Sequence, residues 1–205
     1  DMDCALNDEQ IAAQKMVRDY VQKEVIPTIG EWDRKQEMDP AVLPRLAELG
    51  ILGISIPVRY GGQGFDYLTL GLVCEELERG DTTLRVVMSV HHGLNSMALL
   101  QWGTEEQKQR FLVPQAQGEQ YGAFGLTEPG AGSDVASMTC HARKDGDDWV
   151  LNGEKTYISN AGIAGQYVLF ASTDPDAGRR GISAFIIEPD DPGLSVEPIE
   201  VIAPH

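Results

Sequence analysis

The chain has 205 residues, of which 42% are hydrophobic and 23% are charged, the balance of an ordinary globular protein. Its 32 acidic residues outnumber its 16 lysines and arginines, and the formal net charge of −16 disfavours nucleic acid and anionic membrane surfaces as partners. No apolar run is long enough to cross a membrane. The 3 cysteines and 4 histidines show no metal-ligand or redox spacing, so we expect no metal site.

Cap residues and apolar stripes predict helices in the first half of the chain. Asn7 has the side chain of an N-cap, and Thr104 with Gln107 forms a capping box. Asp39-Pro40 predicts an N-cap followed by proline at the first helical position. The predicted helices run from Asn7 to Pro27, from Asp39 to Gly50, from Tyr67 to Gly80, from Asp81 to Gly103, and from Thr104 to about Ala116.

The second half of the chain changes to the pattern and turn chemistry of strands. Turn signals fall at Asp145-Gly146, Asn152-Gly153 and Gly178. The predicted strands are Tyr121–Thr127, Thr139–Lys144, Trp149–Leu151, Thr156–Ser159, Tyr167–Ser172, Ile182–Glu188 and the strand-like Leu194–Val201. Helices followed by strands predict an α+β fold with two domains, at residues 1–117 and 118–205, which meet near Gln117-Gly118.

The most informative stretch is the glycine-rich run Tyr121–Asp134, which follows directly from a predicted strand. Gly130 and Gly132 allow close backbone approach to a ligand, and Thr127 and Ser133 add hydroxyls. Such a loop can turn amide N–H groups toward an anion. The run lacks both the Rossmann glycine pattern and the P-loop lysine. On these residues alone, a site for a phosphate-sized anion and a plain turn are equally compatible.

The run resembles the flavin-contacting signature of the acyl-CoA dehydrogenase family, Gly-x-Thr-Glu-Pro-x-x-Gly-Ser-Asp. The residues that fit this pattern are Gly125, Thr127, Glu128, Pro129, Gly132, Ser133 and Asp134. Two further segments are similar to that family, Ile56–Gly64 before the run and Leu151–Ala161 after it. Three motifs in the family's order are more specific than any one alone, and the chain is identified as a member.

The resemblance implies an N-terminal all-helical domain followed by an antiparallel β-barrel or sandwich domain. The family adds a C-terminal helical bundle that has no counterpart in this sequence, so we expect the chain to correspond to the first half of such an enzyme. In the family the catalytic base is a glutamate of that bundle, and no residue of this chain is therefore assigned a catalytic role. For Glu128, which lies inside the signature, we expect a loop-fixing role.

The implied activity is FAD-dependent α,β-desaturation of an acyl-CoA thioester, with hydride passing to the flavin. The flavin contacts that the resemblance implies are Phe124, Leu126, Thr127, Gly132, Ser133, Tyr157, Ile158 and Ser159. Tyr157 and Ser159 stand where the family often has tryptophan and threonine, and they keep a ring and a hydroxyl. Ser133 is also expected to contact the acyl-CoA substrate. The alternatives are a core aromatic for Tyr157 and a turn serine for Ser133.

The pair His91-His92 lies on the fourth predicted helix, and we expect both histidines to be buried and hydrogen-bonded rather than functional. Further expectations from the resemblance are an electron-transfer flavoprotein as electron acceptor, a homotetramer or dimer, and the bacterial cytoplasm or mitochondrial matrix. The acidic segment Ser195–His205 departs from the family and leaves the acyl group open to branched, dicarboxylic or carrier-bound types. Two alternatives remain: a flavin oxidase or monooxygenase on the same scaffold, and a non-catalytic binding module.

Overall fold

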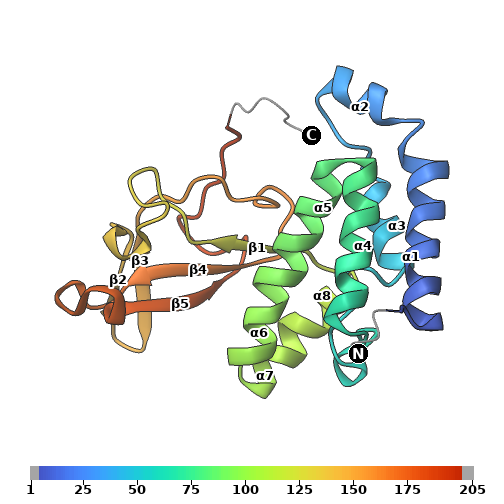
Figure 1. The fold of residues 1–205 in the computed structure, drawn as a ribbon. Helices are drawn as coiled ribbons and strands as arrows, with labels where there is room; N and C mark the ends of the chain where they lie inside the picture. Colours follow the sequence, from blue (N-terminus) through green and yellow to red (C-terminus); the bar gives the residue numbers. More distant parts are fainter. Residues whose placement is uncertain (1–4, 200–205) are drawn as a thin grey trace. The chain divides into compact units, whose positions relative to one another are not determined.

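The computed structural model describes residues 5–199 of the chain (Figure 1). These residues form two compact units, a helical unit that extends to Gln120 and a β-rich unit that spans Tyr121–Ile199. Helices and a sheet in one chain confirm the predicted α+β class. The predicted domain limits, 1–117 and 118–205, stay a prediction.

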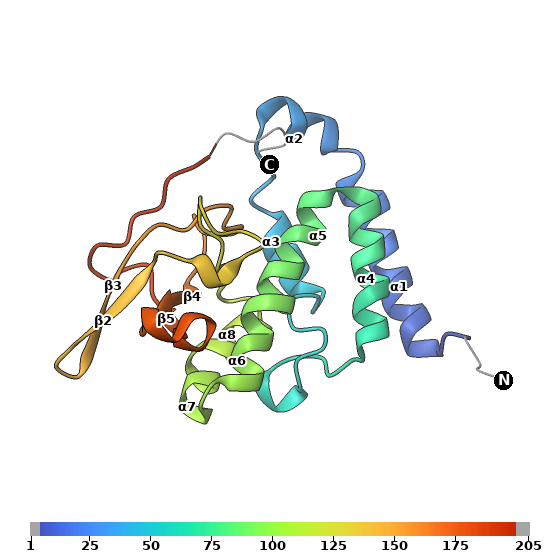
Figure 2. The ribbon, with the colours of Figure 1, turned by 60° about the vertical axis from the view of Figure 1, so that its left-hand side comes forward.

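The helical unit is organised around two long helices that pack side by side, α1 (Asp8–Tyr20) and α4 (Tyr67–Gly80) (Figures 1 and 2). The chain turns at Asp81 into α5 (Thr82–Met88), which packs against α4. The other helices are α2 (Ile29–Lys35), α3 (Val42–Glu48), α6 (Met97–Trp102), α7 (Glu105–Gln107) and α8 (Val113–Ala116). The fully buried apolar side chains of this unit include Val17, Leu46, Leu52, Ile56, Val73, Leu77, Leu84 and Leu112.

The predicted cap at the start of α1 is confirmed. The Asn7 side chain accepts a hydrogen bond from the Gln10 N–H at 2.8 Å, and the Gln10 side chain accepts one from the Asn7 N–H at 3.0 Å. The second predicted helix corresponds to α3. It begins later than predicted, at Val42, because the Asp39 side chain accepts the Ala41 N–H at 2.8 Å in a local turn. Helix α2 has no counterpart among the predicted helices.

The fourth predicted helix, from the Asp81 cap to Gly103, is observed as one helical run with an unexpected segment. Between α5 and α6 the hydrogen bonding changes to the wider π-helical pattern over Ser89–Ser96. The capping box of Thr104 and Gln107 is also confirmed at the start of α7. π-helical segments are rare in proteins, and the predicted plain helix did not include one.

The β-rich unit contains one five-stranded sheet with β4 (Gln166–Ser172) at its centre (Figure 1). Strand β1 (Gly122–Gly125) pairs with β4 in parallel, and β5 (Ile182–Ile187) pairs with β4 antiparallel. Strands β2 (His141–Asp145) and β3 (Asp148–Asn152) form a hairpin, which joins β4 through a parallel pair at His141 and Ser172. The sheet is therefore mixed, which corrects the expectation of an antiparallel barrel or sandwich.

Two predicted strands of this unit are not observed. The segment Thr156–Ser159 forms a turn, because Tyr157 adopts a left-handed φ of 58° that no strand tolerates. Residues 194–199 have no strand pairing, and the last residues of the predicted strand Leu194–Val201 lie outside the described range. The predicted turn at Asp145-Gly146 is confirmed by the β2–β3 hairpin, where Gly146 has a φ of 65°.

Candidate functional site

The glycine-rich run leaves β1 and folds back on itself in a tight turn. Glu128 and Ala131 exchange two backbone hydrogen bonds of 3.1 Å, which leaves Pro129 and Gly130 at an exposed tip. Beyond this turn, the Ser137 hydroxyl donates to the Asp134 carboxylate at the start of a short 3-10 turn. The loop is thus ordered by its own backbone even though it belongs to no sheet.

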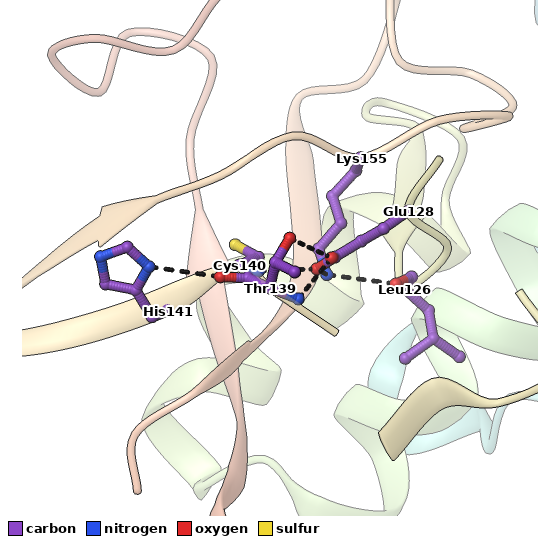
Figure 3. A network of polar contacts seen from close by, with 6 residues as sticks. All are labelled: Leu126, Glu128, Thr139, Cys140, His141 and Lys155. Atoms are coloured by element: carbon purple, nitrogen blue, oxygen red, sulfur yellow. Dashed lines mark hydrogen bonds and ion pairs between the residues drawn. The ribbon is translucent and has the colours of Figure 1, made fainter. Parts of the chain in front are cut away.

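The Glu128 side chain lies at the centre of a buried polar network (Figure 3). Its carboxylate accepts the Thr139 N–H at 2.6 Å, the Thr139 hydroxyl at 2.9 Å and the Cys140 N–H at 3.0 Å. The Lys155 ammonium donates to the same carboxylate at 2.8 Å and to the Leu126 carbonyl at 3.1 Å. The side chains of Glu128 and Lys155 are 2% and 7% exposed, so the pair is shielded from water.

The pKa of Glu128 reflects this environment. Burial by itself would raise the pKa of the carboxyl, but hydrogen bonds from Lys155 and from the Thr139 and Cys140 N–H groups lower the pKa to about 2. Glu128 is therefore a carboxylate at neutral pH, fully engaged with donors of its own chain. A group held this way does not accept a proton from a substrate, and its geometry fits the expected loop-fixing role.

The second motif segment reaches the first through a close backbone approach. At Gly153, with a φ of 151°, an added Cβ would lie 2.6 Å from the Cys140 Cα, so only glycine fits. The chain then runs beside the glycine-rich run, where the Thr156 N–H donates to the Thr127 carbonyl at 2.9 Å. The Asn160 side chain donates to the Gly122 carbonyl at 3.2 Å. Two segments far apart in sequence are thereby fixed side by side.

The predicted flavin contacts fall on these two segments. Leu126 and Thr127 carry the backbone carbonyls that accept from the second segment, while Phe124 stacks near Phe170 with ring centroids 5.0 Å apart. The Tyr157 side chain is 72% exposed, and Ile158 packs against the core around Ala123. Gly132 and Ser133 are exposed, and Leu126, Thr127 and Ser159 are half-buried.

These residues present polar groups that have no partner among residues 5–199. Within residues 5–199, the hydroxyls of Thr127, Ser133, Tyr157 and Ser159 form no hydrogen bond. A Cβ placed on Gly132 would meet no atom within 4 Å, so packing of the described residues does not require glycine there. Free donors and open space on an otherwise fixed frame fit a ligand with many acceptors, as a dinucleotide cofactor such as FAD is.

Three residues of the network were not among the predicted site residues: Lys155, Thr139 and Cys140. A signal existed for the first, because Glu128 and Lys155 are opposite charges placed inside two motif segments. The other two contribute mainly backbone N–H groups, which every residue has, so no residue type could have indicated them.

In the helical unit, His91 and His92 are both fully buried, as expected. His92 Nδ1 lies 3.1 Å from the Leu52 carbonyl and Nε2 lies 2.5 Å from the Ser55 hydroxyl, while His91 Nε2 lies 3.2 Å from the Gln115 carbonyl. Burial, reinforced by the neighbouring His92, lowers the pKa of His91 to about 4, and burial lowers the pKa of His92. Both rings are neutral near pH 7 and tie the helices to adjacent backbone.

The structure over residues 5–199 offers neither a metal site nor a membrane span. No cluster of three or more histidine, cysteine, aspartate or glutamate side chains in this range has a geometry that could hold a metal ion. No helix in the same range combines the length and the apolar character needed to span a bilayer.

The helical unit and the β-rich unit correspond to two successive family models. Residues 7–119 match the acyl-CoA dehydrogenase N-terminal domain, and residues 123–203 match the acyl-CoA dehydrogenase middle domain. The chain belongs to the acyl-CoA dehydrogenase family.

Individual relatives agree with this assignment. The short-chain specific acyl-CoA dehydrogenase of Clostridium acetobutylicum is 41% identical over 97% of this chain and 52% of its own length. The structure of butyryl-CoA dehydrogenase from Megasphaera elsdenii superimposes with a TM-score of 0.90 at 41% identity, over 94% of this chain and 51% of that one. A glutaryl-CoA dehydrogenase from Mycobacterium smegmatis in complex with FADH2 has a TM-score of 0.89 at 34% identity, over 95% of this chain and 49% of that one. The chain spans about half the length of the relatives it matches.

Proposed function

We propose that the protein is part of an FAD-dependent acyl-CoA dehydrogenase, which desaturates an acyl-CoA thioester between its α and β carbons. The observation that carries this proposal is the pair of motif segments, joined by the Thr156–Thr127 and Lys155–Leu126 hydrogen bonds, with free hydroxyls along them. The family assignment and the solved complex of a relative with FADH2 support the cofactor.

In this proposal the chain contributes cofactor binding and leaves proton abstraction to residues outside it. FAD supplies the acceptor for the hydride that leaves the β carbon. The Thr127 and Ser159 hydroxyls donate to polar atoms of the cofactor, and the Tyr157 ring covers an apolar face of it. Phe124, Leu126, Ile158 and Gly132 shape the remaining contact surface. Glu128 stays an ion-paired carboxylate and is not the base.

Ser133 is proposed to contact the acyl-CoA substrate as well as the flavin. It is exposed, it follows the exposed Gly132, and its hydroxyl has no partner within the described range. For the acyl group we propose a short chain, because the Clostridium and Megasphaera relatives are named for short-chain acyl-CoA and butyryl-CoA. The glutaryl-CoA dehydrogenase neighbour makes a dicarboxylic acyl group the second candidate.

The remaining proposals concern the whole protein. We propose an electron-transfer flavoprotein as the electron acceptor, a homotetramer or dimer as the working assembly, and the bacterial cytoplasm or mitochondrial matrix as the location. They follow from membership of the family.

The test is a visible absorption spectrum of the full-length protein that includes this chain, purified with FAD, before and after anaerobic addition of butyryl-CoA or glutaryl-CoA. Bleaching of the flavin band by butyryl-CoA is the expected result, and bleaching by glutaryl-CoA alone would favour the dicarboxylic substrate. A protein that holds FAD but bleaches with neither would contradict the proposed acyl classes. A protein that does not bind FAD would overturn the proposed function.

A further inference from the structure

Lys155 is a buried cation that contacts backbone and side chain of the glycine-rich run at once. It lies two residues before Tyr157, on the segment that follows β3. Its ammonium donates to the Leu126 carbonyl at 3.1 Å and to the Glu128 carboxylate at 2.8 Å (Figure 3). With 7% of the side chain exposed, the lysine has lost most of its hydration, so these two acceptors determine where the ammonium lies.

Glu128 extends the same network to a third segment, the approach to β2. The carboxylate accepts both the N–H and the hydroxyl of Thr139 and the N–H of Cys140. The glycine-rich run, the segment around Lys155 and the start of β2 are therefore held by one enclosed ion pair. These contacts lie outside the strand ladders, and they add to the backbone bonds from Thr156 to Thr127 and from Ser172 to Cys140 that also join these segments to their neighbours.

The bond from Lys155 to Leu126 has a specific geometric consequence. A peptide unit is planar, so fixing the Leu126 carbonyl also fixes the direction of the Thr127 N–H. Neither that N–H nor the Thr127 hydroxyl has a partner in the part of the chain that the structure describes. Next to it, the Thr156 N–H donates to the Thr127 carbonyl at 2.9 Å, which sets the spacing between Thr127 and Tyr157.

We propose that Lys155 is a positioning residue for the flavin: it holds the Leu126–Thr127 peptide and the Tyr157 segment in their binding geometry before the cofactor arrives. This inference rests on the proposed function, because it assigns Lys155 a role toward the same FAD site. An apolar side chain of similar length would fill the space but would leave the Leu126 carbonyl without the lysine donor and the Glu128 carboxylate without its counter-charge. Preorganisation of this kind strengthens binding by reducing the ordering that the ligand must impose.

The helical unit offers a matched control. There, the Arg18 guanidinium lies 2.6 Å from the carboxylate of Glu76, whose side chain is 2% exposed, as that of Glu128 is. Lys155→Met and Arg18→Met each take a cation from a buried glutamate, but only the first touches the flavin segments. Lys155→Met leaves the Glu128 carboxylate buried without a counter-charge. If this single variant does not fold, the double variant Glu128→Gln with Lys155→Met is measured in its place.

Two measurements on the full chain test the inference. The first is backbone hydrogen exchange of the apoprotein over residues 125–134 and 154–160, which reports on the segments without any flavin. The second is the FAD dissociation constant of the refolded apoprotein. Loss of a hydrogen bond from a charged donor predicts exchange that is faster by about 10-fold to 100-fold in Lys155→Met, and a similar rise in the dissociation constant. In Arg18→Met both quantities should stay within about twofold of the parent.

The outcomes separate the inference from the proposed function. Unchanged exchange at residues 125–134 in the lysine variant would overturn the positioning role, whether or not the parent binds FAD. Faster exchange with an unchanged dissociation constant would overturn it too, because the segments would then not need fixing. Equal effects in Arg18→Met would show that general destabilisation is the cause. A parent protein without affinity for FAD would overturn the proposed function, and the exchange experiment would still decide whether Lys155 fixes the segments.

Discussion

The two units each bury a glutamate, and they use it differently. Glu76 in the helical unit and Glu128 in the β-rich unit both have side chains that are 2% exposed. The partners of Glu76, Arg18 and Arg79, reach it from the surface and are 41% and 56% exposed. The partner of Glu128 is the enclosed Lys155, and its other donors lie at the approach to β2. The first glutamate joins two helices, and the second joins three loops.

The difference follows from where backbone hydrogen bonds are made. The backbone N–H groups of helices α1 and α4 are hydrogen-bonded within each helix. The partners of Glu76 are therefore side-chain cations. Just before β2, the Cys140 carbonyl accepts the Ser172 N–H of β4 at 2.8 Å, but the buried Cys140 N–H needs an acceptor from outside the strands. Glu128 supplies that acceptor. In the helical unit the charge adds to regular helices, whereas in the β-rich unit it adds side-chain bonds between irregular segments that only a few backbone bonds join.

The largest expected effect is that of Glu128→Ala. The substitution leaves the Lys155 ammonium buried without a counter-charge and removes the acceptor of the Thr139 and Cys140 N–H groups. Breaking a buried pair this way costs about 3–5 kcal/mol of unfolding free energy. Urea unfolding of the full chain measures it. A loss below about 1 kcal/mol would mean that the sheet, and not the carboxylate, orders these loops.

The two units should lose stability in different pH ranges. The pKa of His91 falls from an ordinary 6.5 to about 4 through burial, and hydrogen bonds lower the pKa of Glu128 from 4.5 to about 2 against the opposing effect of burial. In both cases the folded pKa lies below the unfolded one, so the contribution is complete above the unfolded pKa and is lost as the pH falls to the folded one. We expect losses of about 3 kcal/mol each, first between pH 6.5 and 4 through His91 and then between pH 4.5 and 2 through Glu128.

Two variants test which residue causes the loss of stability in each pH range. His91→Asn should reduce the dependence of the unfolding free energy on pH above 4.5, with the remainder due to the buried His92, and leave the loss below pH 4.5 unchanged. Glu128→Gln should do the reverse, at the cost of a lower plateau. Urea unfolding at a series of pH values measures both limbs. If the loss of unfolding free energy between pH 6.5 and 4 were undiminished in His91→Asn, that loss would belong to another group.

A smaller effect is expected from Gly153→Ala. The added Cβ would lie 2.6 Å from the Cys140 Cα, and alanine disfavours a φ of 151°, so the two backbones must separate. Overpacking of this kind costs about 1–3 kcal/mol. The control is Gly71→Ala on α4, where an added Cβ meets nothing within 4 Å and where alanine should stabilise the helix by about 0.5–1 kcal/mol. Thermal unfolding of both variants tests the contrast, and equal signs would contradict it.

Local rules predicted the parts of the molecule that are local. The Asn7–Gln10 capping box and the turn at Gly146 follow from residues within three positions of each other. The prediction of a strand over Thr156–Ser159 was wrong, because β propensity does not reveal that Tyr157 adopts a left-handed conformation.

Tertiary contacts account for the rest. The parallel pairing of β1 with β4 joins Gly122 to Gln166, across more sequence than any local pattern spans. The motif resemblance indicated two candidate cofactor segments, but the ion pair that joins them connects residues 128 and 155, and no periodicity links these positions. Sequence reasoning therefore indicated which segments form the candidate site, and the structure was needed to show how they are held.

The smallest expected effect is that of Thr139→Val, and it separates the two kinds of donor around Glu128. The substitution removes the hydroxyl that lies 2.9 Å from the carboxylate but keeps the Thr139 N–H at 2.6 Å. One hydrogen bond to a charged acceptor contributes about 1 kcal/mol or slightly more at this exposed residue, so a small loss in urea unfolding is expected. The FAD dissociation constant should stay within about twofold, because the Lys155 bond to Leu126 is intact. An effect on FAD as large as that of Lys155→Met would mean that the whole carboxylate environment, and not the lysine, positions the loop.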